Sequence, residues 1–203
     1  MKDSIKFILK NSIVFALVSF TFSMIGAFFP ESEFTVVIGN PLVVSSVTYE
    51  HVLGHVFWGA IIGLGTLSIR YIILGGSFAI FLDSDHLLQF LDIELVSRMS
   101  HSIPFAVIVS IVFFVILRGK DIRICAVAFG AVLSHIAFDI FLADVAFNSS
   151  TKFPLFSPFT FETISFHGLD WLGIQIIGVS IVAVTSYLFK RKQVRLQNSP
   201  TKT

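Results

Sequence analysis

The residues best suited to chemistry lie at positions 83–86, where Asp83, Asp85 and His86 follow an apolar run. Carboxylates and imidazoles are the ligands that zinc and similar divalent ions take in proteins when thiolates are absent. In a very apolar chain such groups are costly, and they persist mainly when they are paired, hydrated or bound to a metal. This segment therefore predicts either a metal site or a solvated helix end.

Two further segments carry the same residue types. His135 and Asp139 are four residues apart in an apolar run, so their side chains share one face of a predicted helix. The pair suits half of a divalent-metal site, and it also suits a His–Asp hydrogen bond that only joins two helices. His101, between two serines, precedes another apolar run and is near enough in sequence to fold back onto Asp85.

The remaining histidines are weaker candidates. His51 and His55 are four residues apart at the start of an apolar run, a spacing that fits one metal ligand or two packing groups. His167 and Asp170 open the last apolar run and are the weakest candidates, for a role in supporting ligands at most. The expected metal ligands are His55, Asp85, His86, His101, His135 and Asp139.

Two carboxylates are the candidate catalytic groups. Asp83 or Asp139, where it is not a ligand, can act as a base or orient a ligand imidazole. Ser102 and Ser134 fit helix-cap or supporting roles better than a nucleophile, because no Ser-His-Asp spacing indicates covalent catalysis. The mixture of imidazole and carboxylate without thiolate makes zinc the expected cofactor.

Composition places these residues in a membrane protein. The chain has 203 residues, of which 55% are hydrophobic and 13% charged, and its mean hydropathy is +0.88. In a soluble domain, roughly a quarter of all residues are charged. The net charge of +1 gives no signal for nucleic-acid binding, and Cys125, the single cysteine, is expected to be a small buried hydrophobe. Membrane lipid is therefore the expected partner, and the oligomeric state stays open.

The apolar runs predict an all-α, polytopic membrane helical bundle of about five to six transmembrane helices, since one crossing takes about 20 residues. The runs cover residues 12–29, 52–69, 71–82, 103–117, 124–147 and 171–189. The first run follows three lysines and could be a signal peptide, but its length favours an uncleaved helix. The third run is short and needs tilt, a polar cavity at Asp83 or a re-entrant path.

The rest of the chain connects these runs within one predicted integral membrane domain, residues 1–203. Residues 34–49 and 148–168 are expected to be loops, and residues 87–95 a short amphipathic piece. The motifs fall within a core of residues 51–160, and residues 190–203 form a basic tail.

Charge distribution predicts the orientation. With six spans and a cytoplasmic N-terminus, the cytoplasmic segments hold most of the basic residues, and the opposite loops hold only Arg98 and Lys152. This follows the positive-inside rule. We therefore expect a multi-pass plasma-membrane protein with both termini in the cytoplasm. All six histidines then lie on, or can approach, the extracytoplasmic side.

In this order the motifs resemble the membrane-bound metal-dependent hydrolase family, also described as LexA-regulated inner-membrane-associated hydrolases. The matching stretches are Gly54-His55, Asp83-Ser84-Asp85-His86, Ser100-His101-Ser102, Gly130 to Asp139 through Ser134-His135, and Pro158-Phe159. Leu82 stands where the family has a proline, and Arg98 is the only remnant of its His-Arg pair. The motif order is distantly similar to that of zinc-dependent phospholipase C and the single-strand nucleases of that fold.

The resemblance implies a hydrolase that uses a metal-activated water on a phosphodiester or another lipid-type ester at the extracytoplasmic face. Two other functions fit the same residues. An ion or proton transporter also needs His and Asp within spans, although no polar residues continue along the opposite halves of the predicted helices. A non-catalytic membrane protein could use the His–Asp pairs only to hold helices together.

Overall fold

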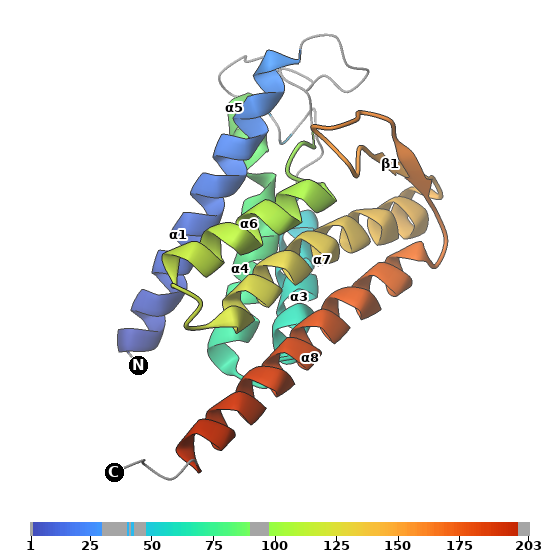
Figure 1. Ribbon diagram of the computed structural model, residues 1–203. Coiled ribbons are helices and arrows are strands. Elements are labelled where there is room, and N and C mark those ends of the chain that lie inside the picture. The colour runs from blue at the N-terminus through green and yellow to red at the C-terminus, as the bar shows by residue number, and fades with distance from the viewer. Residues whose placement is uncertain (1, 30–39, 41, 43–47, 90–97, 199–203) are drawn as a thin grey trace.

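A computed structural model describes residues 2–29, 40, 42, 48–89 and 98–198, and these residues are mostly helical (Figure 1). The long helices are α1 (Lys2–Met24), α3 (Tyr49–Leu64), α4 (Ile69–Phe81), α6 (Ile103–Ile116), α7 (Ile122–Phe147) and α8 (Asp170–Gln197). Shorter helical pieces are η1 (Ile25–Phe28), η2 (Leu82–Asp85) and α5 (His86–Gln89). The predicted helical class is confirmed.

The elements differ from the predicted runs in several places: α1 begins at Lys2, before the run predicted from residue 12, and α3 ends at Leu64, before the predicted end at residue 69. The loop expected at residues 148–168 contains an antiparallel hairpin of β1 (Thr151–Phe153) and β2 (Ile164–Phe166). The last helix continues through most of the basic tail, as far as Gln197. Of the amphipathic piece expected at 87–95, the described part belongs to α5, and residues 90–97 lie outside the described chain. Most of the predicted 34–49 loop also lies outside it.

Four helical stretches are long and apolar enough to cross a membrane: Lys2–Phe28, Ile69–Leu88, Ile122–Val145 and Asp170–Gln197. The outward faces of these helices are apolar too, since Ile176, Val184 and Leu188 of α8 are each more than half exposed. Contiguous exposed apolar surface of this kind is rare on soluble monomers. The shorter helices α3 and α6 have 16 and 14 residues, so the count of five to six spans stays a prediction.

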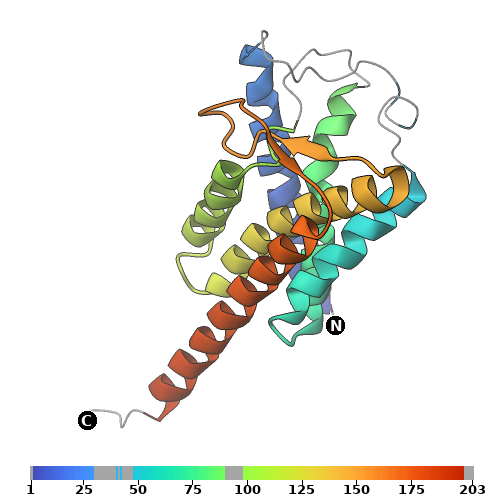
Figure 2. The ribbon, with the colours of Figure 1, turned by 90° about the vertical axis from the view of Figure 1, so that its right-hand side faces the viewer.

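The central helix of the bundle is α7. It packs against α3, α4, α6 and α8, and both views show it in the middle with α8 along one side (Figure 1, Figure 2). Its residues from Val127 to Ala137 are almost all buried, which matches a run that is apolar on every face. His135 and Asp139 therefore reach the interior of the protein.

Glycines bring α3 and α4 into backbone contact. A Cβ atom on Gly59 would lie 2.4 Å from the Gly75 carbonyl oxygen, and one on Gly75 would lie 2.3 Å from the Gly59 carbonyl oxygen. No side chain fits between backbones this close, so glycine is required at both positions. The contact sets the distance between His55, one turn before Gly59, and Asp83, which follows α4.

The hairpin holds the turn that carries His101. Arg98 Nη1 donates a hydrogen bond to the Lys152 carbonyl oxygen at 3.1 Å, and the Ile103 amide donates to the Leu155 carbonyl oxygen at 2.9 Å. On the other side of this turn, Ser102 caps α6 by accepting from the Phe105 amide. The 148–168 segment thus holds the turn of His101 in place from outside the bundle.

Candidate metal centre

Separate segments of the chain bring five histidines and two aspartates together near one end of the bundle, which we call the histidine cluster. Its members are His51 and His55 on α3, Asp83 on η2, His86 on α5, His101 before α6, and His135 and Asp139 on α7. The helices α3 and α7 each supply two residues at a spacing of four, which keeps the two side chains on one face.

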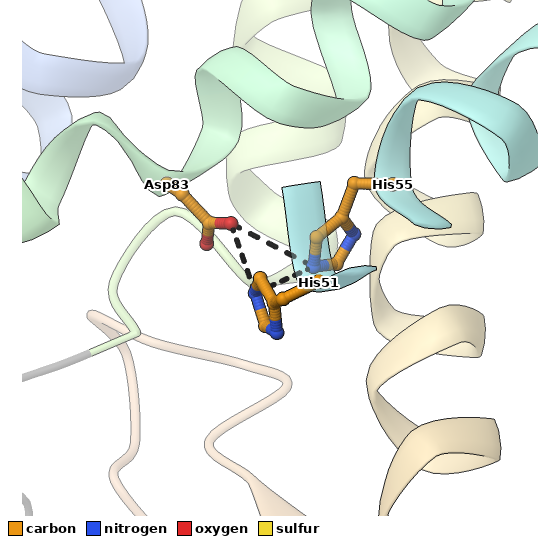
Figure 3. Close-up of side chains that lie close together, drawn as sticks. All are labelled: His51, His55 and Asp83. Atoms are coloured by element: carbon orange, nitrogen blue, oxygen red, sulfur yellow. Dashed lines mark hydrogen bonds and ion pairs between the residues drawn. The ribbon is translucent and has the colours of Figure 1, made fainter. Parts of the chain in front are cut away.

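The carboxylate of Asp83 lies at the middle of the cluster. Its oxygens are 3.1–3.7 Å from the Nε2 atoms of five imidazoles: His51, His55, His86, His101 and His135. Figure 3 shows the His51 and His55 rings and the Asp83 carboxylate directed towards one another. Asp83 therefore contacts every imidazole of the cluster.

Pairs of imidazole nitrogens face each other at short range. His51 Nε2 lies 3.0 Å from His55 Nε2, and His101 Nε2 lies 2.9 Å from His135 Nε2. Two imidazoles bound to one tetrahedral zinc at 2.0–2.1 Å would have nitrogens about 3.3 Å apart. Each distance fits a hydrogen bond between the two rings when one nitrogen carries a proton, and two nitrogens this close also suit a shared cation.

Asp139 joins the two halves of the cluster. Its Oδ1 lies 3.3 Å from His55 Nε2, and its Oδ2 lies 3.8 Å from His135 Nε2 and 3.9 Å from His101 Nε2. The cluster contains three overlapping sets of potential ligands, each with its ligand atoms within 4.8 Å of one another. They are His51, His55 and Asp83; His55, His135 and Asp139; and Asp83, His101 and His135.

The backbone orients the imidazole of His135. Its Nδ1 lies 2.7 Å from the Ala79 carbonyl oxygen, which can only accept, so the proton is on Nδ1 and the Nε2 lone pair faces the cluster. A backbone carbonyl on the second nitrogen is the usual support of a metal-binding histidine. The ring also stacks on His55, with centroids 3.6 Å apart and planes 8° apart. Both rings are held in position before any ligand binds.

Burial makes the cluster costly without a further cation. His55 and His135 are fully buried, and the Asp83 and Asp139 side chains are only 9% and 11% exposed. No described residue donates a hydrogen bond to Asp83 Oδ2 or pairs with His55 Nδ1. Buried carboxylates need a positive partner or full hydrogen bonding. The donor set and the orphaned oxygen therefore fit a divalent metal ion.

Access to the cluster comes from the side of His51 and His86. Their side chains are 15% and 27% exposed, more than any other histidine of the cluster. The Phe138 ring packs edge-on against the His55 ring, with centroids 4.7 Å apart, and also lies edge-on to the His51 ring at 6.2 Å. Among the described residues, the cluster is therefore most accessible beside His51 and His86.

The structure brings together most of the residues that the sequence identified. His55, His86, His101, His135, Asp83 and Asp139 all belong to the cluster. The side chain of Asp85, an expected ligand, lies outside the described part of the chain. Asp83, expected as a base or supporting group, belongs instead to two of the ligand sets.

His51 is a cluster residue that sequence reasoning did not select. Its spacing of four from His55 was the available signal, but the same spacing also suits a packing pair. His167 and Asp170 pair with each other at 3.8 Å and are largely exposed, so the structure gives them no contact with the cluster among the described residues. Cys125 precedes His135 by ten residues, about 15 Å along α7, and brings no thiolate to the site.

The cluster can bind a divalent cation through nitrogen and oxygen ligands, and it can hold or move protons between imidazole and carboxylate. No protein-family model, curated protein or solved structure matches this chain, so its resemblance to the membrane-bound hydrolase family stays a prediction.

Proposed function

We propose that this protein is a membrane-embedded, metal-dependent hydrolase that cleaves a phosphodiester or another lipid-type ester. The observation that carries the proposal is the convergence of five imidazoles on the buried Asp83 carboxylate, with one carboxylate oxygen left without a donor among the described residues. The order of the motifs, which resembles that of a hydrolase family, supports the choice of reaction. The cluster itself supports metal binding only.

We assign metal binding and proton transfer to different residues of the cluster. His51, His55, His101 and His135 would hold the ion together with Asp83, and zinc suits these ligands. When bound, the ion supplies Lewis-acid chemistry that lowers the pKa of a coordinated water to about 7. Asp139 lies 3.3 Å from His55 Nε2 through its Oδ1, while its Oδ2 is 3.8–3.9 Å from His135 and His101 and fits the role of proton acceptor.

The proposed hydrolase works at the extracytoplasmic face of the plasma membrane. In Figure 1 the hairpin lies at the end of the bundle away from both termini. The long α8 ends in a basic stretch that includes Lys190 and Arg195, which the positive-inside rule assigns to the cytoplasm. The cluster, whose His101 turn is bonded to the hairpin, then faces the opposite side.

A transporter fits the interior less well. An ion or proton pathway needs polar groups along its whole length. The stretch of α7 at residues 124–133 contains no carboxylate, imidazole or amine, although it separates the cluster from the next charged group, at Arg123. The proposal therefore favours chemistry at one face over transport.

Hydrolysis of chromogenic substrates tests the reaction. Purified, zinc-loaded protein in detergent is given a chromogenic phosphodiester and a chromogenic carboxylic ester, which together cover both ester classes. Asp139→Asn should retain the metal and lose most activity, since an amide cannot accept the proton; removal of a general base costs about 10²–10⁴-fold. His101→Ala should lose both metal and activity.

His167→Ala is the matched control, because this histidine is exposed and pairs only with Asp170 among the described residues. It should behave as wild type. Metal-loaded wild type that hydrolyses neither substrate would contradict the proposal, and so would Asp139→Asn with full activity. Ion flux into sealed vesicles, lost in His101→Ala, would establish the transporter instead.

A further inference from the structure

A wholly apolar groove lies beneath the hairpin, between α6, α7 and α8. It has a volume of about 300 Å³ and is lined by Ile103, Leu133, Ile136, Leu155 and Ile177 among other apolar residues, with no polar surface. Ligand pockets have volumes of about 300–1,000 Å³ and combine apolar walls with a few polar groups. The volume of this groove is at the lower limit of that range, and no polar group lines it. It therefore suits part of an aliphatic chain and not a polar headgroup.

A second apolar groove continues the first along α6 and α7. It has a volume of about 310 Å³, and Phe129 lines both grooves. Its one hydroxyl, on Ser110, is already bonded to the Ala106 and Cys125 carbonyl oxygens. On α7 the lining residues fall at 125, 129, 133 and 136, a spacing that keeps them on one helix face. The lining residues from 125 to 136 span about 16 Å along α7 at 1.5 Å per residue, and we call the two neighbouring grooves together the apolar track.

The track ends beside the histidine cluster. Phe166, which lines the groove, has its ring centroid 6.2 Å from that of Phe153. The Phe153 ring in turn lies parallel to the His101 imidazole, with centroids 6.2 Å apart. Ile103, two residues after His101, lines the groove directly. The rings of Phe166 and Phe153 therefore lie between the groove and His101, and Ile103 joins the groove to the turn that carries His101.

The position of the track identifies its occupant. It lies on α7 and α8, two of the helices long and apolar enough to cross a membrane, and Ile177 at its edge is 56% exposed. It therefore opens sideways, at the depth of the lipid chains. A partner helix would cover a broad surface, about 800 Å² for a standard interface, whereas each groove is small, at about 300 Å³. Both features suit one extended aliphatic chain.

We propose that this groove binds one acyl chain of the substrate and places the ester of that lipid at the histidine cluster. The inference rests on the proposed hydrolase function and narrows its substrate to long-chain lipid esters. The headgroup would reach the cluster from the side of His51 and His86, where it is most exposed.

Photo-crosslinking tests the groove independently of catalysis. The full-length protein is mixed with phosphatidylcholine that carries a diazirine on one acyl chain, irradiated, and its labelled peptides are mapped. The α7 stretch at 129–136 should be labelled most. Ile177→Trp should lower this labelling about tenfold, because the larger ring takes the place of about two methylenes of the chain. Ile176→Trp is the matched control: it is equally exposed, at 55%, and does not line the groove.

Two further measurements separate the outcomes. Ile177→Trp should raise the KM for a long-chain ester and leave both metal content and hydrolysis of a short, soluble ester unchanged. If wild type binds metal and hydrolyses the short ester but is labelled evenly over all its helices, the groove inference is wrong and the hydrolase stands. If labelling concentrates at 129–136 but the protein neither holds metal nor hydrolyses esters, the hydrolase is wrong and the chain site stands.

Discussion

Two polar groups of this protein are each built around an aspartate carboxylate. They differ in how completely their members hydrogen-bond to one another. The first is the histidine cluster. The second, which we call the Tyr71 cluster, consists of Tyr71, Asp121 and Arg123 near the starts of α4 and α7. There the Tyr71 hydroxyl and Arg123 Nε and Nη2 all donate to the Asp121 carboxylate, with the two arginine bonds at 2.8 and 3.0 Å.

The Tyr71 cluster is complete by itself. One carboxylate balances one guanidinium, and the buried Tyr71 hydroxyl has an acceptor. In the histidine cluster, by contrast, nitrogens face nitrogens at 2.9 and 3.0 Å and an Asp83 oxygen has no hydrogen-bond donor among the described residues. A group that satisfies its own hydrogen bonds needs no ligand to explain it. The comparison indicates that the Tyr71 cluster is structural and that the histidine cluster suits a bound cation.

Metal removal should separate the clusters most clearly. A ligand present at a thousandfold excess over its Kd stabilises the folded state by about 4 kcal/mol. We expect a strong chelator to remove about that much from wild type and from Tyr71→Phe alike, since Tyr71 is no ligand. Thermal unfolding in detergent, followed by intrinsic fluorescence with and without chelator, measures it. If the chelator leaves the unfolding temperature of wild type unchanged, both clusters are structural.

Asp121→Ala should lower the stability of the protein and leave its metal content unchanged. It leaves the Tyr71 hydroxyl and the Arg123 guanidinium without their acceptor, at a cost of about 2 kcal/mol. Combining it with Tyr71→Phe should recover part of this loss, because the buried hydroxyl is then gone. Chemical denaturation measures the free energy of unfolding. A loss of bound metal in Asp121→Ala would show that the two clusters are coupled.

Gly75→Ala should weaken metal binding from a distance. The added methyl would meet the Gly59 carbonyl oxygen and push α3 away from α4, which moves His51 and His55 relative to Asp83. Changes in groups that position ligands typically cost 10–100-fold in metal affinity, and we expect about tenfold. Gly173→Ala on α8 is the control, since nothing lies within 4 Å of its Cβ position. Competition with a fluorescent zinc chelator gives the affinities; equal values would exclude this role of the glycine contact.

Ser102→Ala should give the smallest effect. The hydroxyl of Ser102 accepts from the Phe105 amide at 3.3 Å and so caps α6 next to His101. Loss of such a cap costs about 1 kcal/mol. Ser102→Thr keeps an equivalent oxygen and should recover most of the stability in the same denaturation experiment. If threonine destabilises as much as alanine, the cap is not the reason.

Much of this arrangement could be predicted from local sequence patterns. The apolar runs located the long helices, and the spacing of His135 and Asp139 placed both on one face of α7. The segment at 83–86 was identified by charge in an apolar chain. These signals depend only on helix periodicity and on the cost of burying charge, so they can be read without knowing how the helices pack.

Other features depended on contacts between distant segments. Asp83 reaches the imidazoles from the 3₁₀ turn η2, which follows α4 and whose tighter winding changes the direction of each side chain. Strands of three residues carry little local signal, and an isolated hairpin is marginal. The hairpin forms where it is bonded to the 98–103 turn.

Metal analysis of the detergent-purified protein is the most direct test of the histidine cluster. Wild type and Asp121→Ala should contain stoichiometric zinc, and Asp83→Ala should contain only a trace, because it removes the carboxylate that contacts all five imidazoles. The same trace of metal in all three proteins would contradict the account. The histidine cluster would then be a structural group like the Tyr71 cluster.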